Sequence, residues 1–516
     1  MLHIFSLYMY LPKPPDYAER YAYVKTHKAA LALYNFLSLA GLLTASVLFA
    51  TQAPWLAIYW LYIATYGWWL AFSYAVTLVA RPFRLSEHER LLRRYADGAE
   101  RVDVFVPNCG EDLAVLENTF AHAARLKWPR DRLRLYCLDD RGRPEVRKLA
   151  ERYGFVYLSR PDRGRMAKAG NLKYGFTYSA LAEGGGGDYI LVLDADFAVA
   201  PDFLRQTAPY LRADPRLAIL QTPQYFDSRD PRLNRLARGA AYVQELFYRV
   251  VQTVRDTWGG AICCGTSALY RRKALESVGG FYQIRHSEDV NTGFQLLRHG
   301  WRIRYIPLIL SKGLCPDQMP AYFVQQYRWA CGSLSLCFSR RFWLSPIPRM
   351  VRLNYFGGML YYLCTAAAVL LTPLHPLVMA WFFPQNVHWY NPVFVLPAFI
   401  YTFAVTPFWH RAPWGLYALR LPVVYSWAHA FAIWDLATGN LMPWQPTGAA
   451  STNNKLRRFQ RFCYCCLGYS IAVTLVTYVG VGRAVATYPL YDFLPTALLA
   501  TFWLWVNAGA AIDDGN

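Results

Sequence analysis

The chain has 516 residues, of which 55% are hydrophobic and 17% aromatic, and it carries a formal net charge of +20. This length excludes a single small domain, and the apolar residues collect in runs of about 20, which is the length that spans a bilayer. The positive charge favours anionic partners such as phosphates, nucleotides or lipid headgroups. No nucleic-acid-binding module accompanies it, so nucleic acid is not an expected partner.

The first 80 residues are predicted to form an N-terminal membrane region. Residues 1–28 are aromatic and basic, without the short apolar core and small-residue cleavage site of a signal peptide. Ala29–Ala50 contains no charge and Trp55–Val79 has aromatic residues at both ends, so both are predicted to span the membrane. The basic residues lie outside this pair, which places both flanks in the cytoplasm by the positive-inside rule.

Residues 81–345 are predicted to form a cytoplasmic α/β domain with a mostly parallel, nucleotide-binding sheet, because strand-like and helix-like runs alternate. Strands are expected at Arg101–Pro107, Leu133–Leu138, Phe155–Leu158, Tyr189–Leu193 and Leu217–Thr222, and helices at Asp112–Leu126 and Ala167–Leu181. Ligands of such sheets bind at the carboxyl ends of the strands.

Five acidic residues follow these predicted strands: Glu111, Asp139, Asp140, Asp194 and Asp196. Alternate residues of an extended chain point the same way, so Asp194 and Asp196 can face one point, where they would repel each other unless a cation lies between them. An isolated Asp-x-Asp is most often a solvated turn. Five acids at one sheet edge of a basic protein favour a binding site instead.

Residues 346–516 are predicted to return to the membrane. The expected spans are Tyr355–Leu371, Pro392–Trp409, Phe462–Val481 and Phe493–Ile512. Trp414–Ala437 carries charged residues and is expected to lie at the interface. This arrangement gives six spans in all, with both termini and the α/β domain on the cytoplasmic side of the inner (plasma) membrane.

A series of short motifs runs through the α/β domain: Val106–Glu111 (VPNCGE), Leu138–Asp140 (LDD), Lys168–Asn171 (KAGN), Asp194–Asp196 (DAD), Gln221–Pro223 (QTP), Cys264–Thr266 (CGT), Ser287–Asp289 (SED) and Gln325–Trp329 (QQYRW). Each motif alone is weak evidence. In this order and spacing they resemble the processive membrane glycosyltransferases of family 2, the cellulose-synthase-like group. The resemblance covers about residues 101–330 and implies a glycosyltransferase domain of the GT-A type within a multi-span α-helical membrane protein.

The resemblance assigns the acids to a nucleotide-sugar and its metal ion. A hard divalent cation, Mg²⁺ or Mn²⁺, held by carboxylate oxygens would neutralise the diphosphate. The implied metal ligands are Asp194 and Asp196, of which Asp196 is favoured for direct contact. The implied nucleotide-sugar residues are Glu111, Asp139, Asp140, Lys168, Asp194 and Arg328. Lys168 taken alone would be interpreted as an exposed lysine.

Asp289 is the candidate general base for the incoming hydroxyl. Ser287-Glu288-Asp289 precedes a predicted helix, Val290–Arg298, and matches the family's Thr-Glu-Asp with serine in place of threonine. The alternative is a helix-capping carboxylate, because acids favour helix N-termini. Both roles are compatible in one residue pair.

The acceptor site is assigned to Cys264, Gly265 and Trp329. Trp329 offers a flat ring face to a sugar, and its neighbour Arg328 offers a guanidinium to the departing diphosphate. Their helix, predicted over Ala321–Phe338, is amphipathic and could equally be an interfacial helix with an aromatic anchor. By resemblance it covers the active site.

Two departures from the family pattern are visible. The gating loop Phe-x-Val-Thr-x-Lys-Gly is absent as such, and Pro443–Gly448 takes its place, in which Thr447 and Gly448 could serve a lid without the lysine. Only Asp513–Asn516 follow the last predicted span, so no PilZ domain for cyclic di-GMP is expected in this chain.

The expected function is a UDP-sugar-dependent, inverting, processive β-glycosyltransferase, with UDP-glucose and a β-glucan (cellulose, a mixed or a β-1,3 glucan) as the first hypothesis. Its implied partners are the UDP-sugar, the growing polysaccharide, the bilayer and accessory export subunits. Hyaluronan- or chitin-like synthesis and single-sugar transfer to a lipid remain alternatives. A transporter or scaffold with an inactive transferase domain is the alternative from another class, and it predicts damaged catalytic acids.

Overall fold

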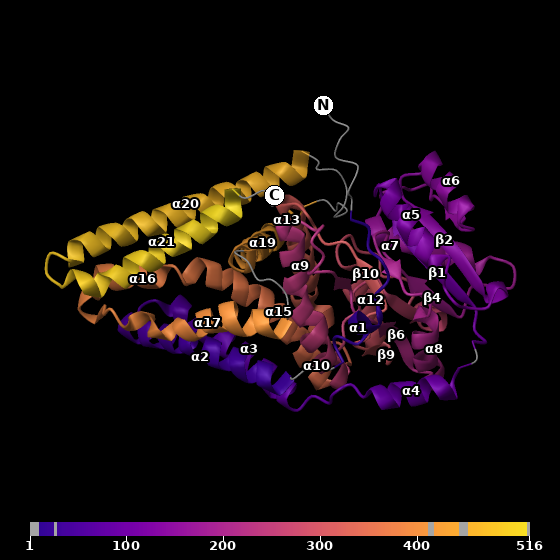
Figure 1. Ribbon diagram of the computed structural model, residues 1–516, viewed down its shortest axis with the longest axis horizontal. Helices are drawn as coiled ribbons and strands as arrows, with labels where there is room; N and C mark the ends of the chain where they lie inside the picture. The colour runs from indigo at the N-terminus through magenta and orange to yellow at the C-terminus, as the bar shows by residue number, and fades with distance from the viewer. Residues whose placement is uncertain (1–9, 25–27, 97, 411–416, 443–452, 513–516) are drawn as a thin grey trace.

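The computed structural model describes residues 10–24, 28–96, 98–410, 417–442 and 453–512. Long helices extend to one side and an α/β domain lies on the other (Figure 1). Within the described residues, four helical segments are long and apolar enough to cross a membrane: Ala32–Gln52, Arg349–Phe382, Arg457–Ala484 and Leu490–Ile512. The chain is therefore a membrane protein with a sizeable domain outside the apolar helices.

The α/β domain is built on a seven-stranded sheet of order β3-β2-β1-β4-β8-β6-β9. Its strands are β1 (Val102–Asn108), β2 (Leu133–Asp139), β3 (Val156–Leu158), β4 (Tyr189–Val192), β6 (Leu217–Gln221), β8 (Ala268–Arg271) and β9 (Arg302–Tyr305). All neighbours are parallel except β8, which is antiparallel to both β4 and β6. The predicted, mostly parallel sheet is confirmed, and β1 is buried along its whole length, as expected for a strand covered on both faces.

Helices cover both faces of this sheet. The helices around it are α5 (Leu113–Ala123), α6 (Pro144–Arg152), α7 (Ala167–Ala180), α8 (Phe203–Ala213), α11 (Arg272–Glu276) and α12 (Glu288–Arg298). Alternate residues of a strand point to opposite faces. Accordingly, Phe105 packs in one core with residues of α7 and α12, whereas Val104 and Val106 pack in a second core with residues of α5, α6 and α8.

A second, three-stranded sheet carries the segment that precedes the first membrane helix. Its strands are β5 (Ala198–Val199), β10 (Ser311–Gly313) and β7 (Tyr225–Phe226). Glu19, on the short helix α1 (Tyr17–Arg20), forms an ion pair with Lys312 of β10 at 2.6 Å. Arg20 donates two hydrogen bonds of 2.7 and 2.8 Å to the carboxylate of Asp202. The N-terminal segment is thus integrated into the α/β domain, which the sequence pattern did not indicate.

The helices between the α/β domain and the apolar spans are α9 (Arg235–Leu246), a π-helical turn (Phe247–Val251), α10 (Gln252–Thr257), α13 (Met319–Cys337) and α14 (Arg340–Trp343). The apolar part comprises α2 (Lys28–Gln52), α3 (Ala57–Leu78), α15 (Arg349–Leu371), α16 (Leu374–Phe382), α17 (Leu396–Ile400), α18 (Thr406–His410), α19 (Tyr417–Thr438), α20 (Asn453–Ala484) and α21 (Leu490–Ile512). Helix α4 (Leu85–Arg94) runs along α8, away from the apolar part (Figure 1).

Two of the six predicted spans are not among the four long apolar segments. The predicted span Trp55–Val79 forms helix α3, which packs along α2, and the predicted span Pro392–Trp409 forms a shorter apolar helix, Leu396–Phe408. Helix α19 packs against α13, α15 and α21 and is drawn nearly end-on beside α20 and α21 (Figure 1). The membrane crossing of the first two and the interfacial placement of α19 stay predictions.

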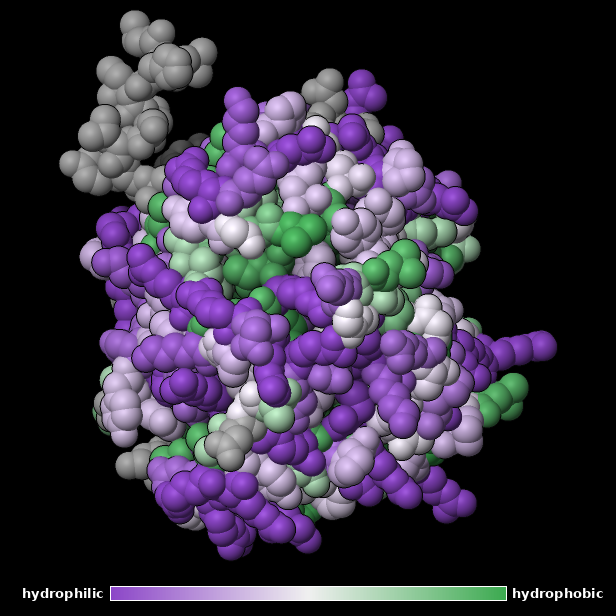
Figure 2. Space-filling view, turned by 90° about the vertical axis from the view of Figure 1, so that its right-hand side faces the viewer, coloured by the Kyte–Doolittle hydropathy of each residue, from purple (hydrophilic) through white to green (hydrophobic). Residues whose placement is uncertain are grey.

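The end of the α/β domain that faces away from the apolar helices is mostly hydrophilic (Figure 2). Hydrophobic side chains appear there mainly around one hollow, surrounded by hydrophilic residues. The contrast with the apolar helices agrees with a domain that projects from a membrane into water.

Candidate active site

The strand ends that carry the predicted acids meet at one edge of the main sheet. Strands β1 and β2 are in parallel register, with Asn108 opposite Asp139, and β4 runs parallel to β1 on its other side. Strand β8 is antiparallel to β4, so the segment that precedes β8 lies at the same edge as the segment that follows β4. Thr266 of the CGT motif therefore reaches Asp194, whose backbone N–H donates to Thr266 Oγ1 at 2.7 Å.

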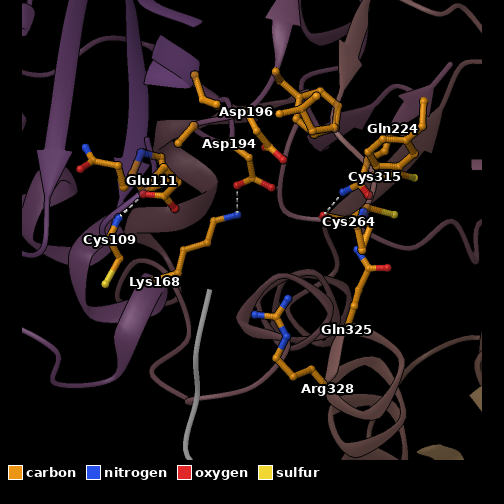
Figure 3. Close-up of a pocket in the computed structure, with 18 of the residues that line it drawn as sticks. Cys109, Glu111, Lys168, Asp194, Asp196, Gln224, Cys264, Cys315, Gln325 and Arg328 are labelled. Atoms are coloured by element: carbon orange, nitrogen blue, oxygen red, sulfur yellow. Dashed lines mark hydrogen bonds and ion pairs between the residues drawn. The ribbon is translucent and has the colours of Figure 1, made fainter. Parts of the chain in front are cut away.

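This edge borders a cavity of about 560 Å³. Nine of the predicted site residues line it: Glu111, Asp140, Lys168, Asp194, Asp196, Cys264, Asp289, Arg328 and Trp329. Figure 3 shows Glu111 and Lys168 on one side, Asp194 and Asp196 at the centre, Cys264 on the other side, and Arg328 reaching up from α13. Asp139 and Gly265 are not among the lining residues.

Lys168, at the N-terminus of α7, is bound to the central acids. Its Nζ lies 2.5 Å from Asp194 Oδ1 and 3.8 Å from Glu288 Oε1, and it donates to the carbonyl of Gly265 at 2.9 Å. Burial alone would lower the pKa of Lys168, but the charges of Asp194 and Glu288 raise it above its ordinary value. Lys168 is therefore a fixed positive charge in contact with the Asp-x-Asp motif.

The central acids have the environment of a cation site. Burial, followed by the charges of Asp194 and Glu111, raises the pKa of Asp196 to about 8, and burial also raises that of Glu111. No group of three or more His, Cys, Asp or Glu side chains suited to a metal occurs in the part of the chain that the structure describes. Two carboxylates nevertheless fit Mg²⁺ or Mn²⁺, because Mg²⁺ typically takes one or two carboxylates and completes its shell with substrate phosphates and water.

Asp139 and Asp140 have different surroundings, although they are adjacent. Asp139 is fully buried and accepts hydrogen bonds from the backbone N–H groups of Arg141 and Arg143 and from the Tyr157 hydroxyl, so it organises the loop after β2. Asp140 lines the cavity and accepts two hydrogen bonds, of 2.5 and 2.9 Å, from the buried guanidinium of Arg160. Sequence reasoning missed Arg160, which belongs to none of the motifs.

Asp289 lies at the start of α12, next to the CGT segment. Its Oδ1 accepts the N–H of Val290 at 2.8 Å. Gly265 has φ +78°, and a Cβ there would lie 2.9 Å from Asp289 Oδ2, so the conformation and the close approach both require glycine. Burial, and then the charge of Glu288, raise the pKa of Asp289 to about 7, a value suited to a general base near neutral pH. Glu288, not predicted as a site residue, also lines the cavity.

Two of the three predicted acceptor residues, Cys264 and Trp329, line the cavity. The carbonyl of Cys264 accepts the amide of Gln224 at 2.6 Å, and the Tyr248 hydroxyl donates to Gln224 Oε1 at 2.8 Å. Helix α13 contributes Arg328 and Trp329 to the cavity lining. Helix α13 also packs against α15 and α19, so this helix connects the cavity to the apolar helices.

Helix α13 also approaches the SED motif through Gly332. A Cβ on Gly332 would lie 1.8 Å from Ser287 Oγ, and Ser287 itself has a left-handed φ of +53°. We expect Gly332→Ala to displace Ser287 and the neighbouring Asp289, costing about 1–3 kcal/mol of stability and lowering activity. Adding Ser287→Gly should restore both, because glycine removes the clash and accepts the positive φ. Thermal unfolding and turnover of the single and double variants test this, and additive losses would contradict it.

The residues just before the predicted lid are tied to the active-site helices. The Tyr327 hydroxyl donates to Asp435 Oδ2 at 2.6 Å and accepts the N–H of Met442 at 3.2 Å, and Arg458 pairs with Asp435. His286, next to the SED motif, lies 3.1 Å from the Met442 carbonyl through Nε2. The predicted lid, Pro443–Gly448, lies outside the described residues.

Comparison with known proteins shows what this chain is similar to. Residues 189–442 match the family described as glycosyl transferase family group 2. The chain is also similar to cellulose synthases. Over 237 residues, 46% of this chain, it is 37% identical to the cellulose synthase 1 catalytic subunit (UDP-forming) of Komagataeibacter xylinus. Over 233 residues it is 35% identical to the cellulose synthase catalytic subunit (UDP-forming) of Pseudomonas fluorescens strain SBW25. The predicted resemblance is confirmed.

The similarity has a limited extent. The match covers 31% of the length of each of these two relatives. Among solved structures, the mannosyltransferase PcManGT from Pyrobaculum calidifontis, in complex with GDP-Man and Mn²⁺, aligns with 87% of this chain and 99% of its own, at 15% identity and a TM-score of 0.43.

Proposed function

We propose that this chain is a processive, inverting β-glycosyltransferase that uses a UDP-sugar, with UDP-glucose as the first candidate, to polymerise a β-glucan and pass it through the membrane. The observation that carries the proposal is the single cavity in which the Asp-x-Asp acids, Lys168, Asp289 and the Arg328–Trp329 pair meet, next to the apolar helices. The catalytic domain and both termini would lie on the cytoplasmic side of the inner membrane.

The residues divide the transfer step between them. Asp289 takes the proton of the acceptor hydroxyl as the hydroxyl oxygen forms its bond to C1 of the donor. The bond from C1 to the diphosphate oxygen breaks at the same time, and its electron pair leaves with UDP. Lys168 and Arg328 face the negative charge that develops on the diphosphate. Attack opposite the leaving group converts an α-linked donor into a β-linked product.

The Asp-x-Asp motif would hold a divalent cation. Asp194 and Asp196 supply oxygen ligands, and Asp196 is favoured for direct contact by the resemblance to the family, while Asp194 is bound to Lys168. Mg²⁺ or Mn²⁺ bound there would neutralise the diphosphate of the donor. Asp140, held by Arg160, and Glu111 would contact the nucleoside side of the donor.

Export of the product is supported by polar side chains within the apolar helices. On α15, Thr365 lies 2.7 Å from His429 Nδ1 of α19, and the ring of Tyr362 packs edge-on against His429 at 4.8 Å. His429 and the Tyr322 hydroxyl of α13 are buried. A polar seam of this kind between α13, α15 and α19 suits a sugar chain, whose hydroxyl groups need partners inside a membrane.

A donor screen tests the proposal. The purified full-length protein in lipid would be given each UDP-sugar with Mg²⁺ or Mn²⁺, and both UDP release and polymer would be measured, with linkage-specific hydrolases applied to the product. We expect UDP release with accumulation of a β-linked polymer. Release without polymer would favour transfer of a single sugar to a lipid, and no release with any donor would exclude the enzymatic role.

A further inference from the structure

In the part of the chain that the structure describes, one buried arginine has no counter-ion. Arg255, on α10, is 6% exposed, and its Nη1 is buried without a hydrogen-bond partner. The titratable groups that act on its charge are Tyr355, Tyr362 and Cys264, with no carboxylate among them, and the Phe247 ring lies 5.9 Å from the guanidinium carbon. Burial lowers its pKa. A buried charge without a partner is strongly unfavourable, so this arrangement needs an explanation.

Other buried arginines of the α/β domain are paired with acids. Arg160 pairs with Asp140 and Arg272 with Asp103, at 2.5 and 2.8 Å. Arg249, less than two helical turns before Arg255, pairs with Glu245. The domain therefore neutralises its buried guanidinium groups elsewhere, and Arg255 departs from that pattern.

Arg255 lies between the acceptor end of the cavity and the apolar helices. Its guanidinium packs against α15 at Gly358, where an added Cβ would lie 2.0 Å from Nη2. Tyr355 and Tyr362 lie about one turn to either side of Gly358, and the Tyr355 hydroxyl is also buried without a hydrogen-bond partner. On the other side is Cys264, which lines the cavity.

The neighbouring turn of α10 supports the CGT segment directly. Gln252, three residues before Arg255, donates to the carbonyl of Ile262 at 2.7 Å and lies 3.4 Å from Cys264 Sγ. The helix that carries Arg255 is thus fixed to the acceptor residues. The guanidinium of Arg255 and the Tyr355 hydroxyl thus lie on the α15 side of Cys264, next to the acceptor residues.

We propose that Arg255 binds a carboxylate of the sugar chain, so that the polymer made here contains a hexuronic acid. The proposal rests on the glycosyltransferase function proposed above and replaces its first candidate product, a neutral β-glucan, with a polymer that contains a hexuronic acid. A guanidinium presents two parallel donors that match a carboxylate, whereas the hydroxyl groups of a neutral glucan would leave its charge uncompensated. The Tyr355 hydroxyl provides a further donor beside it.

Binding of a short acidic sugar tests this assignment without turnover. The probes are a disaccharide of glucuronic acid and glucose in β-linkage, and its methyl ester as the neutral matched control, titrated into the full-length protein in lipid nanodiscs. We expect the acid to bind at least about tenfold more tightly than the ester, because hydrogen bonds to charged groups are the stronger ones. Arg255→Leu should abolish the difference, and Arg255→Lys should keep part of it.

A stability measurement separates this role from a structural one. Removing an uncompensated buried charge should leave the unfolding temperature of Arg255→Leu unchanged or higher. In contrast, Arg249→Leu, which leaves Glu245 without its ion pair, should lower it. A marked fall in the unfolding temperature of Arg255→Leu would show that Arg255 supports the fold, and would overturn the proposal.

Product analysis completes the test. The wild-type enzyme would be supplied with UDP-glucose and UDP-glucuronic acid, singly and together, and uronic acid would be measured in the polymer. Uronic acid in the product, reduced at least about tenfold in Arg255→Leu, is the expected result. A neutral polymer with equal binding of acid and ester would refute the role of Arg255 but leave the glycosyltransferase function intact. No UDP release with any donor would refute the function itself.

Discussion

Replacing Asp289 with asparagine should lower the rate of sugar transfer by about 10²- to 10⁴-fold, the usual contribution of a general base. Asparagine has nearly the same shape and can still accept the N–H of Val290, so the start of α12 should be preserved. What is lost is the ability to take a proton from the acceptor. Turnover measured as UDP release, with UDP affinity and thermal unfolding measured alongside, checks this prediction.

The pH dependence of the reaction provides a second readout of Asp289. A base acts only when deprotonated, and burial together with Glu288 raises the pKa of this carboxyl to about 7. The rate should therefore rise as the pH increases through about 7 and level off above it. Glu288→Gln removes the negative charge of Glu288, so the pKa of Asp289 should fall. The pH range over which the rate rises should then move to lower pH.

The controls separate catalysis from folding. Asp289→Asn with normal UDP affinity and unfolding temperature but no polymer supports the assignment. Near-normal polymerisation by a folded Asp289→Asn protein would exclude Asp289 as the base. A rate that stays constant between pH 6 and 8 would also contradict the role given to it here.

The strands that end at the site were predictable because they are mostly apolar runs bounded by polar residues, although Asp103 interrupts β1 and Arg134 interrupts β2. Four of them, β1, β2, β4 and β6, agree with the prediction to within one residue or so at each end. Strand β8 was missed because Ala268–Arg271 is too short for a periodic signal and leads directly into α11. Its antiparallel position between β4 and β6 is decided by tertiary pairing.

Two helices of the α/β domain, α6 and α8, were not predicted from the sequence, and the reasons differ. Helix α6 had a readable signal, with Pro144 at its first turn and buried residues Val146, Leu149 and Ala150 on one face. Helix α8 contains Pro209, which normally argues against a helix interior. Its fully buried residues, including Phe203 and Leu204, pack against the sheet, and this packing outweighs the local preference.

The site was predictable as a set of motifs but not as a set of contacts. Lys168 was expected to face the donor diphosphate, and the structure places its Nζ against Asp194, 26 positions along the chain. The sequence also could not distinguish Asp139, which bonds to its own loop, from Asp140, which lines the cavity. Adjacent residues at a strand end point to opposite sides, and only the packing decides which side is the cavity.

Replacing Asp196 with asparagine should remove the metal dependence of donor binding. Asp194 and Asp196 lie at the centre of the cavity, and burial, followed by repulsion from Asp194, raises the pKa of Asp196 to about 8. Asparagine keeps one oxygen but loses the negative charge that a divalent cation requires. Since such a cation contributes several kcal/mol, we expect kcat/KM to fall by about 10²- to 10³-fold.

Titration of UDP with and without Mn²⁺ measures this effect apart from turnover. The wild-type protein should bind UDP more tightly with Mn²⁺, whereas Asp196→Asn should bind it equally in both conditions. Asp112→Asn is the matched control: Asp112 lines the same cavity and caps α5 by accepting the N–H of Ala114 at 2.8 Å, a role that asparagine can also fill. It should keep the response to Mn²⁺. If Asp196→Asn kept that response while Asp194→Asn lost it, Asp194 would be the principal ligand, and the contact between Asp194 and Lys168 would have to open when the donor binds.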